Sequence, residues 1–104
     1  MTGRIISGTE AHALRLVTRI TDAPLEQARA LAAEIATRSP DAVAAAKFLL
    51  QESWHRGEAE ALAAERKWQR RVIAGRNQRI AVRRNMPRTP DQPELPFLPR
   101  RIGS

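Results

Sequence analysis

Few side chains in this sequence of 104 residues have the type and spacing that catalysis requires. His12 and His55 are far apart in the chain, and neither has carboxylates at ligand spacing beside it, so we expect both to take structural roles. Glu58 and Glu60 are two positions apart, and residues at that spacing do not share a helix face. The chain has no cysteine, which excludes a thiol nucleophile, a disulfide framework and a cysteine-ligated metal. Since its glycines also form no phosphate-binding loop, the sequence predicts no catalytic residue, no metal site and no bound cofactor.

The chemistry that the sequence does offer is anion binding by arginine. Residues 66–104 hold 11 basic and two acidic side chains, a net charge of +9, whereas residues 1–65 hold seven basic and nine acidic ones, a net charge of −2. The overall charge of +7 therefore arises in the C-terminal 39 residues. Sixteen of the 18 cations are arginine, whose planar guanidinium favours paired contacts to phosphate or carboxylate.

This basic block has several open interpretations. A polyanionic partner is one: nucleic acid, a membrane surface or a phosphate-bearing cofactor. A solvated face, or pairing with acids of another subunit, is the alternative. Arg66, Lys67, Arg70 and Arg71 place like charges four positions apart, which costs roughly a few tenths of a kcal/mol per pair unless an anion compensates. No helix-turn-helix spacing accompanies the block, so sequence-specific DNA binding is the weaker interpretation.

Start and stop signals divide the chain into helices that would position these residues. Ser7 and Glu10 form a capping box, Pro24 and Pro40 occupy first helical positions, and Gly75 is expected as a C-cap. The predicted helices span residues 9–14, 24–38, 40–55, 58–74 and 77–86, and residues 16–20 alternate like a short strand or extended segment. The expected fold class is mainly α, with four to five helices and one short extended segment.

Apolar residues at helical spacing give three of these helices one apolar face each. The faces consist of Leu25, Ala28, Ala32 and Ile35; of Val43, Ala46, Leu50 and Trp54; and of Ala61, Leu62, Trp68 and Val72, which we expect to point inward. Alanine, with 18 copies, favours helix but buries little area. Helices of this composition are better suited to packing on something else than to forming a core of their own.

The C-terminal residues 87–104 differ from the rest of the chain in their prolines. Pro87, Pro90, Pro93, Pro96 and Pro99 recur at a period of three, the period of a polyproline II helix. Residues 96–101 also fit the P-x-x-P-x-R pattern of peptide ligands. We predict a helical region over residues 1–86 and a flexible or loosely docked proline-rich tail over residues 87–104.

Targeting signals are not apparent in the sequence. No stretch approaches the roughly 20 apolar residues that a membrane span needs. The residues after Met1 lead into only two apolar residues, Ile5 and Ile6, which argues against a signal peptide. We therefore expect a cytoplasmic protein without a membrane span.

Several segments, taken in order, resemble the C-terminal region of the crotonase superfamily, the enoyl-CoA hydratase/isomerase family. Residues 3–11 with Leu16, Val17 and Ile20 resemble its T-G-R-x-I-S-A-x-E-A…G-L-V…V segment. Residues 33–40 resemble its A-x-x-I-A-x-x-S-P junction, and residues 45–47 its lysine helix. Residues 61–65 and 77–82 resemble the A-L-x-x-E and N-Q-R-E-A-V motifs that follow. The resemblance covers about residues 2–86.

This resemblance implies a role without catalysis. In the family, the oxyanion-hole amides and catalytic carboxylates lie upstream of the segment matched by residues 3–5, so no catalytic residue carries over. The family's C-terminal helices pack subunits into trimers and cover the acyl-CoA. By register, Arg88 falls at a position that contacts coenzyme A, which makes a coenzyme A thioester the implied substrate. Arg15 and Ile80 depart from the pattern, and Arg15 replaces a glycine that commonly ends a helix in the left-handed conformation.

The expected function is therefore that of a truncated enoyl-CoA hydratase/isomerase family protein, a lyase and isomerase family of fatty acid metabolism. Its helices would serve oligomerisation and acyl-CoA covering, and the isolated chain would be inactive. The expected partners are a second copy or a complementary crotonase-type chain. The alternative is a basic helical module that binds nucleic acid or another polyanion through residues 66–101.

Overall fold

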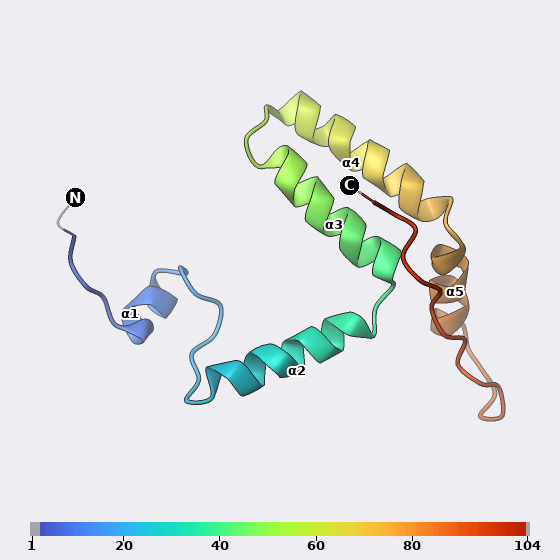
Figure 1. The fold of residues 1–104 in the computed structure, drawn as a ribbon, viewed down its shortest axis with the longest axis horizontal. Coiled ribbons are helices and arrows are strands. Elements are labelled where there is room, and N and C mark those ends of the chain that lie inside the picture. Colours follow the sequence, from blue (N-terminus) through green and yellow to red (C-terminus); the bar gives the residue numbers. More distant parts are fainter. Residues whose placement is uncertain (1–2, 104) are drawn as a thin grey trace. The chain divides into compact units, whose positions relative to one another are not determined.

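The computed structural model describes residues 3–103, which form five α-helices and their connections (Figure 1). The helices are α1 (Gly8–Ala13), α2 (Pro24–Ala36), α3 (Pro40–Ser53), α4 (Glu58–Ile73) and α5 (Arg76–Asn85). The mainly α fold class is confirmed. The strand alternative for residues 16–20 is wrong, because residues 3–103 contain no β-strand with which such a segment could pair. In the same residues, no helix is both long enough and apolar enough to cross a membrane.

The chain divides into two units, Met1–Glu34 and Ile35–Ser104. In the first unit, α1 begins with the predicted capping box. The Ser7 hydroxyl accepts a hydrogen bond from the Glu10 N–H at 3.1 Å, and the Glu10 carboxylate accepts one from the Ser7 N–H at 3.2 Å. Arg4 adds an ion pair to Glu10 at 2.9 Å. These contacts satisfy two N–H groups that a helix start otherwise leaves unpaired.

Helix α1 ends in a Schellman motif. The Leu16 N–H donates to the Ala11 carbonyl at 2.8 Å, and the Arg15 N–H donates to the His12 carbonyl at 2.9 Å. This motif places the residue after the C-cap in the left-handed region, where glycine is preferred. Arg15 occupies that position with φ of 59°, so its Cβ carries a steric cost that glycine would not have.

The first unit buries none of its described side chains. Seven large hydrophobic residues of residues 3–34 are between 43% and 96% exposed: Ile5, Leu14, Leu16, Val17, Ile20, Leu25 and Leu31. The apolar face predicted for α2 is present, but it is open along its length, and Ile35 at its end is 44% exposed. The helices of this unit therefore depend on local capping more than on packing within the unit.

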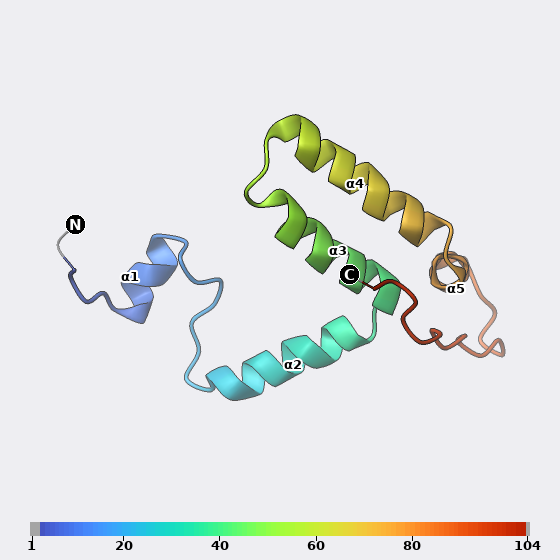
Figure 2. The ribbon, with the colours of Figure 1, turned by 45° about the horizontal axis from the view of Figure 1, so that its top comes forward.

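The second unit contains the core. Helices α3 and α4 lie side by side as an antiparallel hairpin (Figure 2). Ala44 and Ala45 of α3, Trp68 of α4 and Ile102 of the C-terminal segment are all at most 6% exposed and form one cluster. The Phe48 ring stacks on the Trp68 indole with centroids 5.2 Å apart. Two alanines let the helices approach closely, so that one tryptophan supplies much of the buried apolar area.

Three sequence-based details of this unit need correction. The buried face of α3 contains Ala44 and Ala45 and is not the predicted face of Val43, Ala46, Leu50 and Trp54, whose Trp54 is 77% exposed. On α4, Trp68 is buried as predicted, but Leu62 is exposed and Ala64 is buried in its place. Gly75 is the N-cap of α5 with φ of −81°, and the C-cap of α4 is Ala74. Glycine fits there for another reason: a Cβ would lie 3.0 Å from the Val72 carbonyl oxygen.

Candidate anion-binding groove

The C-terminal segment folds back beside α5 and forms one wall of the candidate site. After α5 the chain reverses in a turn, in which the Gln92 N–H donates to the Thr89 carbonyl at 3.1 Å. Pro90 follows Thr89, the position that proline favours in such turns. Residues 93–102 then run back along α5 to α3 (Figures 1 and 2). The turn interrupts the period of three, so the five prolines do not form one continuous polyproline II helix.

Two buried polar side chains hold the returning segment by its backbone. Asp41 is 3% exposed and accepts hydrogen bonds from the N–H groups of Arg101 and Ile102 at 2.8 and 3.1 Å. Asn77 is 2% exposed and donates to Asp41 at 2.8 Å. The Asn77 amide also pairs with Leu98, accepting from its N–H at 2.8 Å and donating to its carbonyl at 3.0 Å. These five hydrogen bonds, here called the Asp41–Asn77 clamp, join α3, α5 and the segment.

The electrostatics of Asp41 favour its charged form. Burial raises the pKa of the carboxyl, but the N–H groups of Arg101 and Ile102 and the Asn77 amide stabilise the carboxylate. The net effect is a pKa below the ordinary aspartate value. The clamp is therefore built on an ionised carboxylate at neutral pH.

Arg84 fixes the middle of the returning segment. Its guanidinium lies over the Phe97 ring at 3.9 Å from the centroid, and its Nε donates to the Leu95 carbonyl at 2.8 Å. Its Nη1 pairs with Glu94 at 3.3 Å. All three contacts are to residues of the segment, so Arg84 stabilises the wall of the site. Its charge is already paired, which makes it a poor ligand-binding residue.

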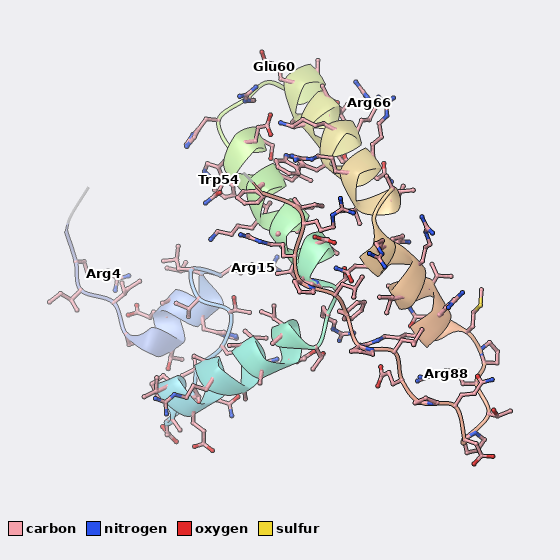
Figure 3. The ribbon with its side chains drawn as sticks, turned by 45° about the vertical axis from the view of Figure 1, so that its right-hand side comes forward. Arg4, Arg15, Trp54, Glu60, Arg66 and Arg88 are labelled. Atoms are coloured by element: carbon pink, nitrogen blue, oxygen red, sulfur yellow. The ribbon has the colours of Figure 1, made fainter. Side chains whose placement is uncertain are left out.

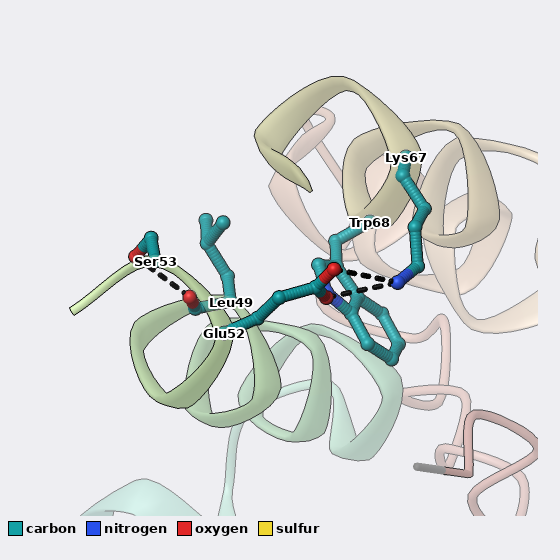
Figure 4. A network of polar contacts seen from close by, with 5 residues as sticks. All are labelled: Leu49, Glu52, Ser53, Lys67 and Trp68. Carbon is teal, nitrogen blue, oxygen red and sulfur yellow. Dashed lines mark hydrogen bonds and ion pairs between the residues drawn. The ribbon is translucent and has the colours of Figure 1, made fainter. Parts of the chain in front are cut away.

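Two cations of α4 also have structural partners. Lys67 pairs with Glu52 of α3 at 2.8 Å, and the Trp68 indole N–H donates to the same carboxylate at 2.9 Å (Figure 4). The Lys67 hydrogen bond is the main cause that lowers the pKa of Glu52. The Arg71 guanidinium also lies over the Trp68 ring, 4.8 Å from its centroid. These side chains join α3 to α4 around Trp68.

Several arginines of the basic block have no such partner, and four of them lie on α5 or just beyond its end. Within residues 3–103, the guanidinium groups of Arg76, Arg79, Arg83 and Arg88 make no ion pair, no hydrogen bond and no aromatic contact. Arg76, Arg79 and Arg83 are spaced three and four positions apart, so they share one face of α5. Arg88 lies beyond the end of α5, near the turn of the returning segment (Figure 3).

These four arginines line two adjoining hollows between α5 and the returning segment. The first, of about 420 Å³, has Arg76, Arg79 and Arg83 on one side and Leu95 among the residues of the other. The second, of about 390 Å³, is lined by Arg83 and Leu95 again, together with Arg88. We call the two together the arginine groove. A larger hollow of about 680 Å³ contains the Arg84–Glu94 ion pair, so its charge is mixed and it is a poorer site for an anion.

The remaining sequence-based candidates do not converge on a site. His12 lies in the last turn of α1 and His55 follows α3, in different units, and both are exposed. Glu58 and Glu60 lie in the first turn of α4 and are exposed. Within residues 3–103, no three histidine, aspartate or glutamate side chains are grouped as a metal site. Arg88, the residue to which the family resemblance assigned coenzyme A binding, does lie in the arginine groove.

Sequence reasoning missed the Asp41–Asn77 clamp. Asp41 lies in the first turn of α3, where an acid has an ordinary explanation in the helix dipole. Its backbone partners are 60 and 61 positions away, so no local pattern reports them. Asn77 lies in the first turn of α5, where asparagine also has an ordinary local explanation, so the sequence did not single it out either.

Comparison of the chain with models of known protein families, with curated proteins and with solved structures finds no match in any of the three. The class that the fold and the site define is a mainly helical chain whose second unit carries a cationic groove.

Proposed function

We propose that the chain is a non-catalytic helical module of the enoyl-CoA hydratase/isomerase type, which packs on a partner chain and covers part of an acyl-CoA ligand. The main support is the open apolar surface of the first unit. A high share of exposed large hydrophobic residues is typical of surfaces that a partner covers. Seven large hydrophobic residues within residues 3–34 are exposed and none is buried, so a partner chain would supply the packing that this unit lacks.

The chemistry in this proposal belongs to the partner. A complementary chain would provide two carboxylates to move protons and to activate water, and backbone amides to hold the thioester oxyanion. This chain would contribute packing surface and cationic side chains, with Arg88 as the residue nearest to the coenzyme A phosphates.

A direct test combines an activity assay with a mass measurement. We expect the pure chain to give no turnover of crotonyl-CoA above the buffer background, and light scattering to show self-association. Leu31→Ser on the open face of α2 should reduce that self-association, whereas Ala33→Ser, at an exposed position off that face, should leave it unchanged. Crotonyl-CoA turnover by the pure chain would overturn the non-catalytic role. A parent chain that light scattering shows to be monomeric would overturn the expected self-association.

A second function is favoured by the four partnerless arginines: binding of a polyanion through residues 66–101. Contacts between arginine and phosphate release counterions, so binding of this kind weakens steeply as salt rises. A gel shift of labelled DNA should therefore be strong at low salt and lost at high salt. Competition by coenzyme A would show whether both polyanions use the same surface. No shift at low salt, or a shift that is insensitive to salt, would reject this function.

A further inference from the structure

The like charges of α5 are arranged to receive an anion. Arg76, Arg79 and Arg83 lie on one face of a helix whose ten residues include no acid, so nothing on that helix offsets their repulsion. Arg83 and Arg88 continue the row into the second hollow. The two acids of the returning segment do not neutralise these arginines. Glu94 pairs with Arg84, and Asp91 makes no ion pair within residues 3–103. A ligand with repeated negative charges would relieve this repulsion along the whole row.

The groove is a recess with two walls. It is bounded by α5 on one side and by the returning segment on the other, and the clamp and Arg84 hold that segment in place. The two hollows together have the volume of a small-molecule site, and a single strand can follow such a recess, whereas the phosphates of a duplex lie on a wide, convex surface. Arg76 and Arg83 are seven residues apart on α5, about 10 Å along the helix axis, so the row spans more than a single phosphate group.

The other wall of the groove is mainly apolar and has few hydrogen-bond donors. It includes Leu95, Pro93 and Pro96, and the prolines have no N–H. Phe97 does not offer a stacking surface here, because it lines neither hollow and the Arg84 guanidinium lies over one face of its ring. Gln92, at the turn, is the polar side chain of this wall. A wall with one amide can contact sugars and base edges but has too few hydrogen-bonding groups to read a run of bases.

From this combination of a cationic row, a two-walled groove and a mainly apolar wall, we infer that the arginine groove binds single-stranded nucleic acid through its phosphates, without sequence preference. The inference rests on the polyanion-binding function and names its ligand. Four phosphate contacts on a single strand predict that the logarithm of the binding constant falls with the logarithm of salt at a slope of about −3. Affinity should come from the arginines, with little added by stacking.

The test uses the full chain, a fluorescein-labelled twelve-residue oligothymidylate and anisotropy at several salt concentrations. The triple variant Arg76→Gln, Arg79→Gln and Arg83→Gln removes three of the four contacts and keeps good helix formers in α5. We expect it to bind at least tenfold more weakly at low salt, with the slope reduced to about −1. The matched control, Arg66→Gln, Arg70→Gln and Arg100→Gln, changes the net charge equally but leaves the groove intact. It should retain the slope of the parent chain.

The outcomes separate this inference from the function on which it rests. Equal losses in both triple variants would show a general attraction to the basic block and overturn the groove as the site. Tighter binding of a twelve-base-pair duplex than of the single strand would overturn the choice of ligand. Binding of coenzyme A or inorganic polyphosphate without binding of the oligothymidylate would overturn the inference and leave the polyanion-binding function standing. No binding of any of these probes would overturn both.

Discussion

Residues 3–34 and residues 35–103 both form helices with local caps, but they differ in how many side chains they bury. The first set has a complete capping box and a complete Schellman motif, yet it buries no side chain. The second set caps α3 with Ser39, but α4 and α5 begin at glycines without a side-chain hydrogen bond. It nevertheless holds the core around Trp68 and the buried Asp41–Asn77 clamp. The comparison shows that capping defines where helices begin and end, while contacts between distant segments decide which unit has an interior.

The largest effect that we predict is the loss of the clamp. Asp41→Ala removes the acceptor of three hydrogen bonds and leaves two buried donors, on Ile102 and Asn77, and the part-buried N–H of Arg101 without this partner. Because each unsatisfied buried donor costs about 1–3 kcal/mol, we expect the free energy of unfolding to fall by about 4 kcal/mol. Urea denaturation followed by tryptophan fluorescence measures it. The control is Asp91→Ala, at an exposed acid in the turn of the returning segment. A comparable loss in the control would show that the effect is not specific to the clamp.

Two isoleucines test the comparison with the same substitution in each unit. Ile102 is 6% exposed and completes the core, whereas Ile5 is 96% exposed. Ile102→Ala should lower the free energy of unfolding by about 3 kcal/mol, since it removes buried area and leaves a cavity. Ile5→Ala should change it by less than about 0.5 kcal/mol. Equal effects in the same denaturation experiment would mean that the first unit has an interior after all.

The clamp also predicts an acid sensitivity located in the second unit. The pKa of Asp41 is lowered in the folded chain, so its contribution to stability is present above the pKa of an unfolded aspartate, about 3.9, and is lost as pH falls below it. Glu52 has a lowered pKa as well, so acid affects more than one contact. The difference between the parent chain and Asp41→Asn isolates the clamp. We expect that difference to be constant from pH 7 to 5 and to shrink below pH 4. A difference that does not change with pH would contradict the role of an ionised Asp41.

Much of the helical organisation could be predicted from the sequence, because its signals are local. Ser7 with Glu10, Pro24 and Pro40 each mark a helix start within a few residues, and the structure confirms all three starts. The same reasoning misplaced the buried face of α3, because two carboxylates, Asp41 and Glu52, lie at the ends of that face. A carboxylate ordinarily indicates solvent, and these two turn inward only because they meet partners far along the chain.

The candidate site shows the same division between local and distant signals. The charge of residues 66–104 was evident from composition, but composition does not separate arginines with structural partners, such as Arg84, from those without, such as Arg83. That separation depends on the path of the returning segment, which the clamp sets. The expectation that residues 87–104 are flexible concerns motion, and it stays a prediction. The structure adds the contacts that such motion would have to break, and Asp41→Ala removes those that Asp41 makes.

The smallest effect that we predict belongs to the first unit. Arg15 has φ of 59° at the end of the Schellman motif, and glycine adopts that conformation without the steric cost of a Cβ. Arg15→Gly should stabilise the motif by about 1 kcal/mol, which corresponds to about fivefold slower amide hydrogen exchange at Leu16. Arg19 is the matched control, because its φ is not positive and glycine there only adds freedom to the unfolded chain. Arg19→Gly should leave that exchange rate unchanged or raise it. If exchange at Leu16 were equally fast in the parent chain and in Arg15→Gly, the cap would not limit the stability of α1. The weakness of this unit would then lie wholly in its missing packing, and a partner chain would be the factor that slows exchange.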